Sequence, residues 1–183
     1  MSDREAFFAL AGIAATMLGT FIVAAVFYIG SDAHRRLGAA EAADGYWRSG
    51  MRWIFAAYAI PMLAGLALGA LPRVWAVLIF IGLTAVLVTL TFDTGRRILR
   101  REGGPSSSTL KLNEWLTTII VLMSAILPWV LGGWMPQPTS FIPSLFLILA
   151  AGFTSTAALL MTEFDASRGE VDPGASASQD DEI

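Results

Sequence analysis

Five long apolar stretches alternate with short polar segments along the chain. They cover approximately residues 6–29, 53–71, 74–92, 115–135 and 141–161, and none contains Asp, Glu, Lys, Arg or His. Because a helix rises about 1.5 Å per residue, each stretch is long enough to cross roughly 30 Å of hydrocarbon. The pattern predicts an all-α, polytopic helical membrane protein with five transmembrane helices.

The connections between the apolar stretches predict two tight hairpins. Only Pro72 and Arg73 separate the second and third stretches, and a five-residue segment with two prolines, residues 136–140, separates the fourth and fifth. Proline ends one helix or opens the next at such positions. Residues 1–165 are therefore expected to form one transmembrane domain. Residues 166–183, rich in Gly, Pro, Ser and acids, are expected to form a disordered cytoplasmic tail.

Composition supports the membrane class. Hydrophobic residues make up 55% of the chain and charged residues 15%, with a mean hydropathy of +0.63, whereas a soluble domain has about 25% charged residues. There is no cysteine, which excludes disulfides, thiolate metal sites and cysteine nucleophiles.

Basic residues predict the orientation in the membrane. Ten of the twelve lie in the segments after the first, third and fifth stretches, and the other two, Arg4 and Arg73, lie on the opposite side. Segments rich in Arg and Lys stay in the cytoplasm. We therefore expect a multi-pass protein of the cell membrane with its N-terminus outside and its C-terminus in the cytoplasm.

Aromatic residues are expected at both membrane interfaces, because an amphipathic ring is favourable at headgroup depth. The inner belt would hold Trp47, Trp53, Phe92, Trp115 and Phe164, and the outer belt Phe7, Phe8, Trp75, Trp134 and Phe141.

Small residues predict where helices approach closely. Gly65 and Gly69 form a GxxxG pair in the second stretch, and Ala11, Ala15 and Gly19 repeat this spacing in the first. Such faces allow close backbone contact in lipid. The contact could be made within one chain or between the chains of a homo-oligomer. Two prolines inside the second and fourth stretches, Pro61 and Pro128, are expected to bend their helices.

Hydroxyl groups are the polar side chains expected at depth. Thr154, Ser155 and Thr156 form the densest cluster, and they would line a path for a polar substrate or ion if the protein has one. Hydroxyls in membrane helices otherwise bond to the preceding turn of their own helix or to a neighbouring helix. Proton relays, voltage sensors and many coupled transporters need ionisable groups within the membrane. The five apolar stretches contain no Asp, Glu, Lys, Arg or His.

The two longer inner segments share the pattern Asp-x-x-Arg-Arg-aliphatic, starting at Asp32 and Asp93. This similarity has two interpretations, a duplicated hairpin or convergent composition at a membrane edge. The arginines of the second occurrence of this pattern belong to a cluster of four: Arg96, Arg97, Arg100 and Arg101. This cluster is expected either to contact anionic lipid or only to set the topology.

Three functions fit these features. The one favoured is a noncatalytic membrane component, such as an accessory subunit, scaffold or assembly factor. The second is a small oligomeric transporter or channel for a neutral or small solute, and the third is an interfacial lipid-modifying enzyme that uses Asp32, His34 or Asp93. GxSxG, HExxH and Walker A motifs are missing. The lipid bilayer, a second copy or another membrane protein are the expected partners, with no nucleic acid, cofactor or metal.

Overall fold

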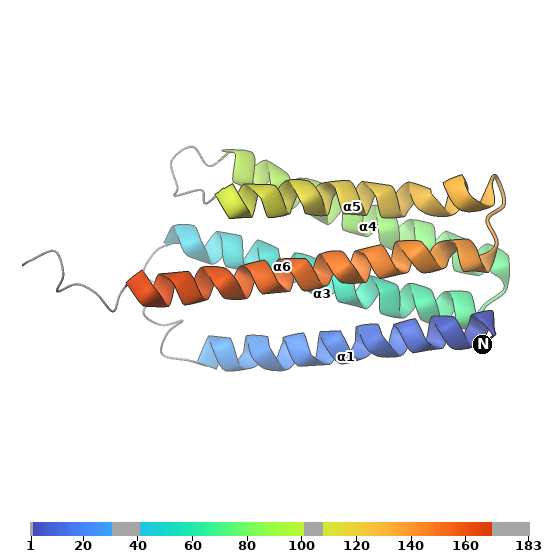
Figure 1. Cartoon of the computed structure of the whole chain (residues 1–183), viewed down its shortest axis with the longest axis horizontal. Coiled ribbons are helices and arrows are strands. Elements are labelled where there is room, and N and C mark those ends of the chain that lie inside the picture. Colours follow the sequence, from blue (N-terminus) through green and yellow to red (C-terminus); the bar gives the residue numbers. More distant parts are fainter. Residues whose placement is uncertain (1, 31–40, 101–107, 170–183) are drawn as a thin grey trace, which may run out of the picture.

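The computed structural model describes residues 2–30, 41–100 and 108–169. Over these residues the chain is all-helical, with no strand. Its five long helices run side by side along the longest axis of the molecule (Figure 1). They are α1 (Asp3–Gly30), α3 (Glu41–Ala70), α4 (Arg73–Arg100), α5 (Ser108–Gly132) and α6 (Ile142–Gly169), with a short 3-10 helix, η1 (Pro138–Phe141), before α6.

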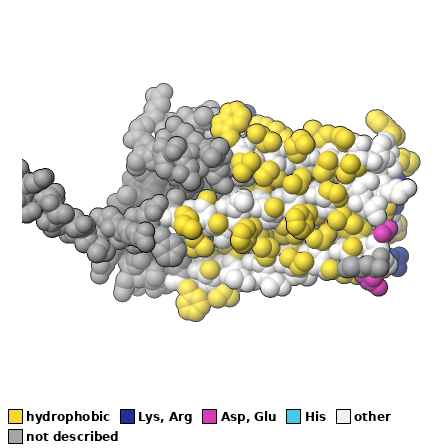
Figure 2. All heavy atoms as spheres, viewed as in Figure 1, with side chains coloured by type: hydrophobic (Ala, Val, Ile, Leu, Met, Phe, Trp, Pro, Cys, Tyr) yellow, Lys and Arg dark blue, Asp and Glu magenta, His cyan; other side chains and the backbone are white. Residues whose placement is uncertain are grey.

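All five helices are long and apolar enough to cross a membrane. The apolar parts of the helices are Asp3–Phe27, Gly50–Ala70, Arg73–Asp93, Trp115–Gly132 and Pro138–Met161, which match the five stretches found in the sequence. Hydrophobic side chains cover the long side of the bundle, and charged side chains gather at the end that carries the N-terminus (Figure 2).

The fourth helix ends earlier than the sequence pattern predicted. Gly133 has a φ of 67°, a conformation that glycine adopts without steric cost and that commonly ends helices. Its backbone N–H donates to the carbonyl of Trp129 at 2.9 Å. Helix α5 therefore stops at Gly132 instead of Met135, and the chain turns through η1 into α6.

At the other end of the bundle the helices continue beyond their apolar parts. Helix α4 extends to Arg100 and α6 to Gly169. The first four residues of the expected disordered tail are part of α6, and residues 170–183 lie outside the described part of the chain.

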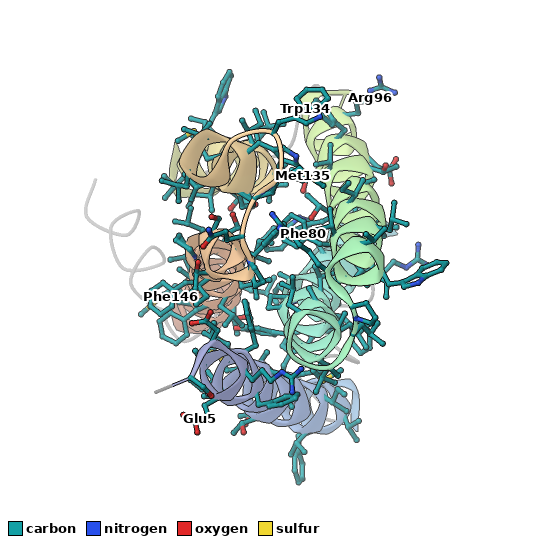
Figure 3. All side chains as sticks on the ribbon, turned by 90° about the vertical axis from the view of Figure 1, so that its right-hand side faces the viewer. Glu5, Phe80, Arg96, Trp134, Met135 and Phe146 are labelled. Atoms are coloured by element: carbon teal, nitrogen blue, oxygen red, sulfur yellow. The ribbon has the colours of Figure 1, made fainter. Side chains whose placement is uncertain are left out.

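Helix α3 lies at the centre of the bundle. It contacts α1, α4 and α6, while α5 contacts α4 and α6, an arrangement seen along the bundle in Figure 3. Over an 18-residue stretch of the apolar part of α3, 67% is buried, compared with 22% over such a stretch of α1 and of α5. The outer helices therefore present wide apolar faces to their surroundings, as helices in lipid do.

Two sets of hydrogen bonds hold the N-terminal end of the bundle, where α1, α4 and α6 begin. The Glu5 carboxylate accepts from the Ser2 backbone N–H at 2.8 Å, and the Ser2 hydroxyl accepts from the Glu5 N–H at 3.4 Å. This reciprocal pair is a capping box. The guanidinium Nη2 of Arg73 donates to the carbonyl oxygens of Met135 and Pro136, and so links the α3–α4 turn to the α5–α6 connection.

Candidate functional site

The Gly65 and Gly69 face of α3 lies against α1. A Cβ atom added at Gly65 would lie 3.0 Å from the Phe7 carbonyl oxygen and 3.3 Å from the Ala11 Cβ. One added at Gly69 would lie 3.0 Å from the ring of Phe8. The two glycines therefore allow the close approach of α1 and α3 within one chain.

The small residues predicted on α1 do not all share this contact. Ala11 is buried, whereas Ala15 and Gly19 are exposed, and a Cβ at Gly19 would meet nothing within 4 Å. Gly12 is also exposed and open. The structure thus brings Gly65 and Gly69 to α1 but leaves Ala15 and Gly19 on the outer face of the bundle.

Aromatic rings fill the interior near the N-terminal end. The Phe80 and Phe141 rings meet edge to face with centroids 4.8 Å apart, and Trp129 lies 6.3 Å and 6.1 Å from them. Edge-to-face pairs of this kind add stabilisation beyond burial alone. Phe80 lies among the helices in the end view, whereas Phe146 of α6 points away from the bundle (Figure 3).

Hydroxyl groups link the helices in the half of the bundle away from the N-terminus. The indole Nε1–H of Trp53 donates to Thr91 Oγ1 at 2.8 Å, joining α3 to α4. The Tyr58 hydroxyl is 3.0 Å from Thr156 Oγ1 and joins α3 to α6. Thr117 and Ser155 hydroxyls are 3.4 Å apart, between α5 and α6.

The predicted Thr154–Ser155–Thr156 cluster is thus divided among different contacts. Ser155 and Thr156 reach α5 and α3, and Thr156 also donates to the Gly152 carbonyl at 2.8 Å. Thr154 is exposed and donates to the Ala151 carbonyl at 3.0 Å. These bonds join α6 to its neighbours or close a turn of α6. Bonding of this kind is the second of the two roles given for the hydroxyls in the sequence analysis, beside lining a polar path.

Eight of the ten predicted belt residues separate into two groups in the structure, and the side chains of Trp47 and Phe164 lie outside its described part. Phe8, Trp75, Trp134, Phe92 and Trp115 are exposed near the helix ends, as belt residues would be. Trp53, Phe7 and Phe141 are buried and pack inside the bundle. Hydropathy cannot separate the two groups, because a ring near the end of a span can point to lipid or to another helix.

A pocket of about 240 Å³ opens at the N-terminal end. Its wall includes the start of α1, the end of α3, the start of α4 and the entry into α6, and it is lined by Asp3, Arg4, Phe7, Leu68, Gly69, Leu71, Arg73, Ala76, Val77, Pro138 and Phe141. Sequence reasoning missed this pocket, because it interpreted Pro72 and Arg73 only as a joint between spans.

No protein-family model, curated protein or solved structure matches this chain.

The charged residues singled out at the opposite end are only partly described. Arg96 and Asp93 are exposed on the last turns of α4. Asp32, His34 and Arg101, and the side chains of Arg97 and Arg100, lie outside the described residues. Among the side chains that the structure describes, no group of three or more His, Cys, Asp or Glu could hold a metal ion.

Proposed function

We propose that this chain is a noncatalytic component of a membrane that acts through the outer faces of its helices, as an accessory subunit, scaffold or assembly factor. The observation that carries this proposal is that the described interior side chains pack the helices together or bond them to one another. The apolar part of the central helix, α3, is mostly buried, aromatic rings pack near one end of the bundle, and most of the described interior hydroxyls bond to other helices or to their own. Such an interior stabilises the bundle, while the wide apolar faces remain for partners.

The main alternative is a small transporter or channel for a neutral solute. It would need several copies, because a bundle of five short-looped helices has little room for a path. Among the described side chains, the buried hydroxyls of Thr84 and Ser144 have no hydrogen-bond partner, and this observation favours it. Reconstitution separates the two functions.

Purified protein in vesicles is expected to pass water, glycerol and small ions no faster than protein-free vesicles. The measurement is light scattering after an osmotic step, together with an ion-sensitive dye. In the native membrane, a photoreactive residue in place of Ile13, Val86 or Phe146, each exposed on a different helix, should give a discrete adduct with another membrane protein from at least one face. Solute flux that increases with protein content, or no adduct from any face, would reject the proposal.

We also propose that the N-terminal end of the bundle faces outward and the C-terminal tail lies in the cytoplasm of a cell-membrane protein. The ten-to-two division of basic residues supports this orientation. A reporter fused after Ile183 or inserted near Ser106 is expected to be cytoplasmic, and one inserted at Gln137 to be outside. Cytoplasmic labelling at Gln137 would contradict this orientation.

A further inference from the structure

The pocket at the N-terminal end combines a buried apolar floor with a charged rim. Phe7, Leu68, Ala76 and Phe141 are buried and form the floor. The charged lining residues Asp3, Arg4 and Arg73 are exposed and form the rim. A ligand that fits this pocket has an apolar part and a charged part in contact with different walls.

The depth of the pocket indicates where such a ligand would come from. The apolar parts of α1, α4 and the η1–α6 segment begin at Asp3, Arg73 and Pro138, and these three residues all line the pocket. The rim therefore lies at the boundary between apolar and polar surroundings, and the floor lies on the apolar side. A membrane lipid has its phosphate and its first acyl carbons at the same boundary.

The charges on the rim favour an anion. Two guanidinium groups stand against one carboxylate, which leaves one net positive charge. Arginine binds phosphate through several donors in a planar fork. Arg73 already donates through Nη2 to two carbonyls, which fixes its position beside the pocket. An ammonium-bearing headgroup would place a third cation beside the two arginines, although the Asp3 carboxylate could accept a hydrogen bond from it.

We propose that this pocket binds an anionic phospholipid of the leaflet at the N-terminal end, with its phosphate at Arg4 and Arg73 and the start of an acyl chain on the Phe7–Phe141 floor. The site differs from the predicted arginine cluster after Asp93, because Arg96, the member whose side chain is described, lies near the other end of α4. It also does not depend on whether the chain is a scaffold or a transporter.

Native mass spectrometry of the full chain in detergent tests the site with phosphatidylglycerol, phosphatidylethanolamine and phosphatidylcholine of equal chain length. Phosphatidylglycerol is expected to be retained most. Arg4→Gln should weaken its retention about fivefold, which is the effect of one basic residue near an anionic headgroup. Val77→Phe should weaken retention further by filling the pocket. Arg73 is left unchanged because it also links two connections of the fold.

Two control variants match the changes in charge and in size. Arg52→Gln removes an exposed arginine at the opposite end of the bundle, outside the arginine cluster, and Val86→Phe enlarges an exposed position on α4. Both should retain phosphatidylglycerol more strongly than Arg4→Gln and Val77→Phe do. Equal losses in the test and control variants, or equal retention of the three lipids, would overturn the proposal. Displacement of the lipid by glycerol 3-phosphate as efficiently as by short-chain phosphatidylglycerol would also overturn it, since the apolar floor would then contribute nothing.

Discussion

Replacing Gly65 and Gly69 together by leucine is expected to lower the thermal stability of the protein in detergent strongly. The atom nearest a new Cβ at Gly65 is a backbone carbonyl oxygen of α1, at 3.0 Å, and backbone cannot move aside as a side chain can. Overpacking costs roughly 1–3 kcal/mol per site. The larger part of the loss should come from Gly65, because at Gly69 the nearest neighbour is the partly exposed ring of Phe8. Fluorescence-monitored melting of the single and double variants measures both effects.

The outer face of α1 offers a matched control. Gly12→Leu with Gly19→Leu makes the same change at the same kind of residue, but both positions are open to at least 4 Å. This pair should melt close to the wild type. If both pairs lose stability equally, the loss comes from leucine in these helices and not from the α1–α3 contact. Loss in the Gly12 and Gly19 pair alone, with dissociation of a larger species, would instead place the important contact between copies.

The helical spans could be predicted because the membrane imposes them. A segment that crosses hydrocarbon must satisfy its backbone internally and must be apolar over most of its length, so the positions of charged residues are enough to mark the helices. The end of α5 was missed by three residues for a local reason. Gly133 adopts a positive φ, and nothing in the hydropathy of the apolar residues around it, up to Met135, signals the turn.

The pairing of helices was harder to predict than their number. GxxxG spacing predicted that Gly65 and Gly69 make a close contact, but it could not name α1 as the partner, and the similar spacing at Ala15 and Gly19 lies on the exposed surface. Lipid is as apolar as the interior of a helix bundle, so hydrophobicity does not separate the buried faces of the helices from the exposed ones. For the same reason Trp53 was interpreted as a belt residue although it donates a hydrogen bond to Thr91 inside the bundle. The end pocket needs four chain segments to meet, which no local pattern records.

Replacing Phe80 by alanine is expected to give a large loss of stability. Its ring is fully buried and meets Phe141 edge to face. Truncation of a buried phenylalanine costs roughly 3–5 kcal/mol in water-soluble proteins. In a membrane the ring leaves lipid instead of water when the protein folds, so the free energy of transferring the ring out of water contributes less to the loss. The lost ring contacts and the cavity remain, and we expect about 2–4 kcal/mol.

Phe146→Ala is the control for this change, because it removes the same side chain from the exposed face of α6 (Figure 3). It should leave the melting temperature nearly unchanged, while Phe80→Leu should fall between Phe80→Ala and the wild type because it refills part of the cavity. Reversible unfolding in mixed detergent gives the free energy of unfolding for each variant. A loss for Phe146→Ala as large as that for Phe80→Ala would contradict the burial assigned to the two rings. It would indicate that the α6 face is covered by another copy or by a partner. Contacts on the outer surface would then contribute as much to the free energy of unfolding as the packing in the bundle interior.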